Sequence, residues 1–110
     1  MEMVMAYALL VLAIGTEVLG TSLLIPSEGF TRLWPTVGSL VAYALSFLLL
    51  AQTVKQIPVG MVYAMWSGLG TVTIVAVGAA FLGEPLSIVK AVGITLVIAG
   101  VVVLNLGGAH

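Results

Sequence analysis

Charged residues are so sparse along this chain that they divide it into long hydrophobic blocks. The first block runs from Met3 to about Leu24 and is interrupted only by Glu17; the others cover residues 33–54, 56–83 and 91–109. A helix needs about 20 apolar residues to cross a bilayer, and each block reaches or approaches that length. Within the blocks the residues do not alternate between apolar and polar, as the strands of an outer-membrane barrel would. The pattern therefore predicts an all-α integral membrane chain with four transmembrane helices.

Short connections that contain turn residues separate the blocks. Pro26 and Gly29 follow the first block, Pro58 precedes most of the third, and Gly83 with Pro85 ends the third. Proline at the start of a helix and glycine just after the end of one are common boundary signals. We therefore expect a single four-helix transmembrane domain over residues 1–110. Its helices should lie near residues 3–24, 34–54, 58–82 and 87–106.

The composition indicates that lipid surrounds the chain, and it argues against several classes of function. Hydrophobic residues make up 62% of the chain and charged residues only 6%, whereas soluble domains average about 25% charged. A net charge of −1 does not indicate a nucleic-acid partner. The chain has no cysteine, and its one histidine is the terminal His110, so we expect no metal site and no cofactor. It shows no phosphate-binding loop or nucleophilic triad, so we do not expect an enzyme.

The charges in the connections bear on assembly. Four short helices enclose only a small cavity, so we expect more than one copy of the chain to form a pathway. In a four-span topology the termini and the middle connection share one side of the membrane. That side carries Lys55, and the other side carries Arg32 and Lys90. This small difference gives only a weak positive-inside bias, so the chain could insert both ways up and form an antiparallel pair.

Glu17 is the main candidate for function, because it is the one carboxylate inside a hydrophobic block. A charge at membrane depth costs at least about 2.5–3.5 kcal/mol, and such residues usually mark an ion or substrate path. Thr21, one helical turn away, could hydrogen-bond to Glu17 or to its own backbone. Loss of water favours the neutral form of a carboxyl group, so a carboxylate here could exchange a proton for a cation. The alternative is a structural polar group that a neighbouring helix satisfies.

Aromatic and hydroxyl side chains form a second group of candidates. Tyr43 and Ser46 lie on one face of the second block, and Tyr63 and Trp66 lie at helical spacing in the third. Aromatic faces attract cations, by about 0.5–2 kcal/mol each. These residues could therefore line a cation site near the depth of Glu17. They could instead belong to the interfacial belt or to helix packing.

Glycines form the third group. Gly68 and Gly70 lie inside the third block, where they could provide a hinge or allow close helix packing. In the fourth block Gly93, Gly100 and Gly107 recur every seven residues, which returns to nearly the same helix face. A glycine stripe on an apolar helix favours helix–helix contact. We therefore expect the fourth helix to contribute the contact between copies.

Three motifs together resemble the small multidrug resistance (SMR) family over essentially the whole chain. They are residues 16–21 (TEVLGT), 27–35 (SEGFTRLWP) and 58–70 (PVGMVYAMWSGLG). The resemblance implies proton-coupled export across the bacterial inner membrane by an antiparallel, dual-topology homodimer whose two membrane carboxylates share one site. One position departs from the pattern, because Ile25 stands where family members usually carry a lysine.

The resemblance also implies roles for individual residues. Glu17 corresponds to the proton- and substrate-binding carboxylate. The other implied positions are Tyr43, Tyr63, Trp66, Ser46 and Thr21 for binding, Gly68 and Gly70 for a helix kink, and Gly93 and Gly100 for the dimer contact. Guanidinium exporters of the family tend to carry Trp where this chain has Gly20, and Trp-Thr-Gly where it has Trp66-Ser67-Gly68. The smaller residue at position 20 is similar to the multidrug branch, which takes bulky lipophilic and quaternary ammonium cations.

The predicted function is therefore a proton-coupled antiporter in which protons and cations compete for Glu17 of both subunits. Three alternatives stay open: a guanidinium exporter, one subunit of a heterodimeric SMR pair, and a membrane subunit that transports nothing. An unpaired carboxylate argues against the last, because a subunit that only packs has no need of one.

Overall fold

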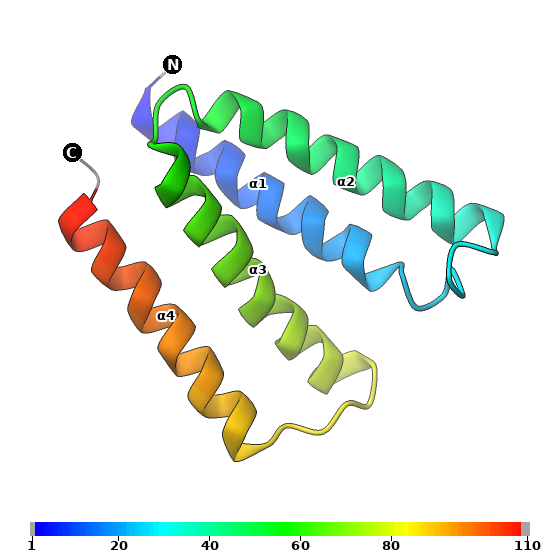
Figure 1. Ribbon diagram of the computed structural model, residues 1–110. Helices are drawn as coiled ribbons and strands as arrows, with labels where there is room; N and C mark the ends of the chain where they lie inside the picture. The colour runs from blue at the N-terminus through cyan, green and yellow to red at the C-terminus, as the bar shows by residue number, and fades with distance from the viewer. Residues whose placement is uncertain (1, 109–110) are drawn as a thin grey trace. The chain divides into compact units, whose positions relative to one another are not determined.

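The computed structural model describes residues 2–108, which fold into four α-helices and no β-strand (Figure 1). α1 spans Met3–Ser22, α2 Leu33–Thr53, α3 Val59–Phe81 and α4 Ile88–Gly108. Each helix is long and apolar enough to cross a membrane, by length and composition. The prediction of an all-α chain with four such helices is confirmed. His110 lies outside the described residues.

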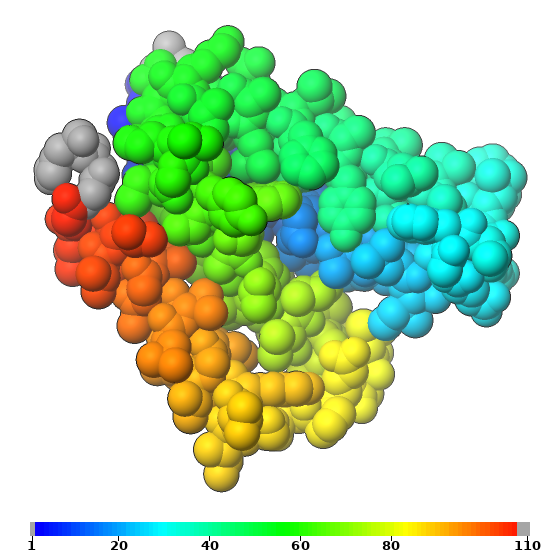
Figure 2. Space-filling view, viewed as in Figure 1, coloured from blue at the N-terminus to red at the C-terminus, as the bar shows by residue number. Residues whose placement is uncertain are grey.

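The helices pair in chain order into two compact units. The N-terminal unit ends at Ile57 and contains α1 and α2; the C-terminal unit begins at Pro58 and contains α3 and α4. Within each unit the two helices run antiparallel and lie side by side (Figure 1). In the space-filling view α4, in orange and red, forms one side of its unit (Figure 2). A single domain over residues 1–110 stays a prediction.

α1 ends at Ser22, before the predicted limit at residue 24, because Pro26 has no N–H to donate to the Ser22 carbonyl. A compact turn follows, in which Glu28, Gly29 and Phe30 all have positive φ angles of 49°, 71° and 67°. Ser27 is buried, and its hydrogen bonds stabilise this turn. Its hydroxyl donates to the Leu24 carbonyl at 2.6 Å, and its own carbonyl accepts the N–H groups of residues 31 and 32. The turn thereby directs the chain back along α1.

Small residues let α1 and α2 approach each other closely. Ala6, Ala13 and Gly20 are buried on α1, and Ser39, Ser46 and Thr53 are buried on α2. Both sets recur every seven residues, so each forms one stripe along its helix. Small residues at such a contact bring two helix backbones near enough for cross-helix hydrogen bonds. This close contact positions the polar residues described below.

Candidate functional site

Glu17, Thr21 and Tyr43 form a chain of hydrogen bonds within the N-terminal unit. The Thr21 hydroxyl donates to Glu17 Oε1 at 2.9 Å and lies 2.6 Å from the Tyr43 hydroxyl on α2. A threonine hydroxyl has one proton. Because Thr21 gives that proton to the carboxylate, it must accept the proton of Tyr43. The sequence left two possible partners for the Thr21 hydroxyl, Glu17 and the helix backbone. The structure shows the hydrogen bond to the Glu17 carboxylate.

The second oxygen of the Glu17 carboxylate is in a different situation. Oε2 is buried and has no hydrogen-bond partner among residues 2–108. The basic residues Arg32 and Lys55 lie in connections, and Lys90 in the first turn of α4 donates to the Pro85 carbonyl at 2.6 Å. One carboxylate oxygen is thus held by Thr21, and the other is buried without a hydrogen bond from the described residues.

Gly20 provides the space in which Tyr43 reaches Thr21. A Cβ atom built on Gly20 would lie 3.2 Å from the Ser39 carbonyl oxygen, 3.2 Å from Tyr43 Cδ1 and 3.3 Å from Tyr43 Cε1. Those distances are shorter than ordinary van der Waals contact. Neither neighbour is free to withdraw, because Ser39 is hydrogen-bonded to the Gly20 carbonyl itself and Tyr43 to Thr21.

We expect Gly20→Ala to lower the thermal stability of the detergent-solubilised protein and to weaken tetraphenylphosphonium binding. Overpacking a close contact costs about 1–3 kcal/mol, which the better helix propensity of alanine, worth about 1 kcal/mol, offsets only in part. Gly15→Ala is the matched control on the same helix, because a Cβ there would meet nothing within 4 Å. The control should be neutral or stabilising. Equal melting temperatures for the two variants would contradict the tight contact at Gly20.

Ser46 faces the same helix contact rather than open space. It is fully buried, and its hydroxyl donates to the Ala13 carbonyl of α1 at 2.7 Å. Ser46 and Tyr43 therefore both face α1, and they lie about one turn apart on α2. Its contact with α1 is to the backbone four residues before Glu17.

Tyr63 and Trp66 form an aromatic pair on α3 in the C-terminal unit. Their ring centroids are 6.2 Å apart and their planes stand at 88°, an edge-to-face arrangement that aromatic pairs favour. The Tyr63 side chain is 65% exposed, so the subunit leaves most of it uncovered. That this pair lies near the depth of Glu17 stays a prediction from the sequence.

The glycines of the C-terminal unit fall into two classes. A Cβ on Gly68 would lie 3.1 Å from Val101 Cγ2 and 3.2 Å from a methyl group of Val97, so Gly68 permits close α3–α4 packing. A Cβ on Gly93 or Gly100 would meet nothing within 4 Å. α3 is one continuous helix across Gly68 and Gly70, and a hinge there stays a prediction.

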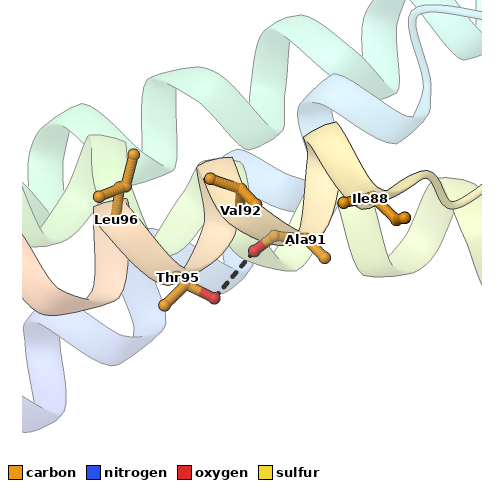
Figure 3. A pocket seen from close by; sticks show the side chains of 5 residues that line it. All are labelled: Ile88, Ala91, Val92, Thr95 and Leu96. Carbon is orange, nitrogen blue, oxygen red and sulfur yellow. Dashed lines mark hydrogen bonds between the residues drawn. The ribbon is translucent and has the colours of Figure 1, made fainter.

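Two hollows of the C-terminal unit differ chemically from the Glu17 region. One, of about 280 Å³, is lined by residues of α4 alone (Figure 3). Its one polar side chain, Thr95, donates to the Ala91 carbonyl of its own helix at 2.8 Å (Figure 3). The other, of about 250 Å³, lies between α3 and α4 and includes Lys90. Neither contains a carboxylate, so neither is a candidate for a cation site.

Comparison with known proteins decides the family. The family model described as Small Multidrug Resistance protein matches residues 5–97. This chain belongs to the small multidrug resistance family. The multidrug resistance protein Mmr of Mycobacterium tuberculosis is 52% identical over 107 residues, which cover 96% of this chain and 100% of Mmr.

Two further relatives of this SMR chain come from other bacteria. The multidrug transporter EmrE of Escherichia coli is 50% identical over 94 residues, 86% of each chain. The quaternary ammonium compound-resistance protein QacG of a Staphylococcus species is 40% identical over 104 residues, which cover 94% of this chain and 97% of QacG. The resemblance seen in the sequence motifs is confirmed.

Two polar residues of this SMR chain lie outside the predicted site set. Ser39 is fully buried and donates to the Gly20 carbonyl at 2.8 Å. Asn105 on α4 donates to the Val101 carbonyl at 2.9 Å and to Met65 Sδ on α3 at 3.3 Å. Helical spacing could have indicated Ser39, which precedes Tyr43 by four residues. Asn105 could have been found as the one amide side chain in the fourth hydrophobic block.

Proposed function

We propose that this chain is a proton-coupled exporter of lipophilic and quaternary ammonium cations in the bacterial inner membrane. Protons and substrate compete for Glu17, and the chain has no enzyme activity. The observation that carries the proposal is the Glu17 carboxylate inside α1, with one oxygen held by Thr21 and the other buried without a partner among the described residues. The printed names of Mmr, EmrE and QacG support multidrug and quaternary ammonium compounds as the substrate class.

The hydrogen-bond chain suits a carboxyl group that alternates between two protonation states. When Glu17 is charged, Tyr43 donates to Thr21 and Thr21 donates to the carboxylate. When Glu17 holds a proton, hydroxyl rotation allows Thr21 to donate to Tyr43 instead, because each hydroxyl both donates and accepts. The contact between Thr21 and Tyr43 can therefore persist in both states. A bound cation would neutralise the same carboxylate and remove the need for the proton.

The packing at Gly20 supports the multidrug branch over guanidinium export. The guanidinium exporters that the sequence motifs resemble tend to carry Trp at this position. Here even a Cβ atom would press on the Tyr43 ring and on the α2 backbone. An indole side chain at position 20 would fit only if the Tyr43 side chain moved away from Thr21. That movement would break the hydrogen bond that links Tyr43 through Thr21 to Glu17. The aromatic faces for a bulky cation would then come from Tyr43, Tyr63 and Trp66.

We propose that the working unit is an antiparallel homodimer held by α4, with both Glu17 carboxylates in one shared site. Gly93 and Gly100 support this arrangement, because a Cβ built on either would have no atom of its own subunit within 4 Å. A second α4 could approach there closely. The near balance of Lys55 against Arg32 and Lys90 is compatible with insertion in both orientations.

Gly100→Leu should weaken this dimer and reduce transport. A Cβ at position 100 has no atom of its own subunit within 4 Å, so we expect the added side chain to act mainly on the contact with the partner. Ala99→Leu is the matched control, because it adds similar bulk about 100° around the same helix. Energy transfer between labelled subunits in detergent measures the dimer fraction. An unchanged fraction for Gly100→Leu would mean that the glycine stripe faces lipid.

The proposed function is tested by proton-driven uptake into liposomes that contain only this chain. Tetraphenylphosphonium should be taken up when a proton gradient is imposed, and guanidinium should not. Uptake of guanidinium instead would indicate the other branch of the family. Uptake of neither would contradict transport by a homodimer and leave the heterodimer subunit or the non-transporting subunit.

A further inference from the structure

Two buried serines of α2 donate hydrogen bonds to backbone carbonyls of α1. The Ser39 hydroxyl bonds to the Gly20 carbonyl at 2.8 Å, and the Ser46 hydroxyl bonds to the Ala13 carbonyl at 2.7 Å. Both serines are 0% exposed. The donors are seven residues apart on α2, and the acceptors are seven residues apart on α1. The acceptors bracket Glu17, four residues before it and three after it.

Each of the two carbonyls has a place in the backbone hydrogen bonding of α1 near Glu17. In an α-helix the Ala13 carbonyl accepts the N–H of Glu17 itself, so Ser46 bonds to the peptide group that anchors the Glu17 backbone. The Gly20 carbonyl lies in the last turn of α1. In a continuing α-helix the Gly20 carbonyl would accept the N–H of Leu24, but that N–H bonds to the Thr21 carbonyl instead. The Ser39 hydroxyl on α2 provides a hydrogen bond to the Gly20 carbonyl in its place.

We propose that Ser39 and Ser46 are positioning residues that fix the register of α2 on α1 and thereby hold Tyr43 on Thr21 and Thr21 on Glu17. Tyr43 lies between the serines on α2, four residues after one and three before the other. A slide of about 1 Å along the line between the two hydroxyl oxygens would lengthen the 2.6 Å contact of Tyr43 with Thr21 beyond hydrogen-bond distance. The inference rests on the proposed function only in taking Glu17 as the group that binds protons and cations.

Thr53 provides a matched control from the same stripe of α2. It is 0% exposed, like the two serines, but its hydroxyl donates to the Leu49 carbonyl of its own helix at 2.9 Å. Thr53→Val therefore removes a buried hydroxyl without removing a bond to α1. Tyr43 is the only titratable side chain on α2, and Tyr7 and Glu17 are those on α1. The segments outside these helices add Glu2, Glu28, Arg32 and Lys55 to the unit.

The first measurement is the ¹³Cζ resonance of Tyr43, which reports on its hydroxyl hydrogen bond, in tyrosine-labelled full-length protein in micelles. Tyr43→Phe assigns the resonance, and Thr21→Val gives its position without the acceptor. Ser39→Ala should move the resonance toward the Thr21→Val position. Ser46→Ala should move it in the same direction, and it provides a second test if Ser39→Ala folds poorly. Thr53→Val should leave it in place. A wild-type resonance in both serine variants would overturn the proposal, whether or not the protein exports anything.

The second measurement is the pH profile of tetraphenylphosphonium binding, which a purely structural role would not move. Ser39→Ala should displace the profile in the same direction as Thr21→Val, and Thr53→Val should not displace it. Because the serine acts through Tyr43, adding Ser39→Ala to Tyr43→Phe should give no further displacement. A lower melting temperature with an unchanged profile would reduce the serines to ordinary packing residues. Absence of binding by the wild type would instead count against the proposed function, and the resonance would still decide the role of the serines.

Discussion

Glu17→Gln is expected to reduce proton-driven tetraphenylphosphonium uptake to the level of empty liposomes while the dimer still assembles. Glutamine has nearly the same shape, and its amide oxygen can accept the Thr21 hydroxyl that Glu17 Oε1 accepts at 2.9 Å. It cannot release a proton or carry a negative charge. No second carboxylate lies inside a hydrophobic block of the chain, so no other side chain can replace it.

The control for this variant removes a carboxylate outside the spans. Glu2 precedes α1, is exposed, and makes no side-chain cap to that helix, so Glu2→Gln should transport as the wild type does. Uptake by each variant is measured in liposomes at matched protein density, with dimer content checked by size-exclusion chromatography. Coupled uptake by a correctly inserted Glu17→Gln protein would remove Glu17 from the coupling step.

The four helices could be predicted because a lipid solvent leaves the backbone few choices. Every peptide group must be bonded within its own span, so a long uncharged block has to be helical. The end of α1 was harder to place, since residues 23 and 24 are as apolar as the helix before them. Pro26 stops the helix by denying a donor to the Ser22 carbonyl, and no hydrophobic pattern records that. The homodimer depends on a second copy, which the fold of one chain does not test.

Only part of the candidate site could be predicted. Glu17 and Thr21 are on one helix, so a spacing of four is enough to bring them together. The contact of Tyr43 with Thr21 depends on the register between two helices, which sequence spacing cannot supply. The same register places Ser39 opposite Gly20, and neither residue appears unusual alone in an apolar span. The roles of Tyr63 and Trp66 in binding depend on how the two units assemble and stay predictions.

Tetraphenylphosphonium affinity is expected to rise steeply with pH and then level off once both Glu17 side chains of a dimer are charged. Each displaced proton makes the binding constant change by about tenfold per pH unit while the carboxyl groups remain protonated. Two carboxylates in one site would release protons as a coupled pair, so the slope could approach about a hundredfold per pH unit.

Calorimetry from about pH 6 to pH 9 would measure this dependence of binding on proton concentration. Trp66→Ala separates the two contributions to affinity. It removes an aromatic face and leaves both carboxylates, so it should weaken binding at every pH and leave the shape of the profile unchanged. Glu17→Asp should shift the profile, because the shorter side chain no longer reaches Thr21 in the same way. Wild-type affinity that stays constant across the range would show that cations and protons do not share Glu17, and Glu17 would then be a structural residue of α1.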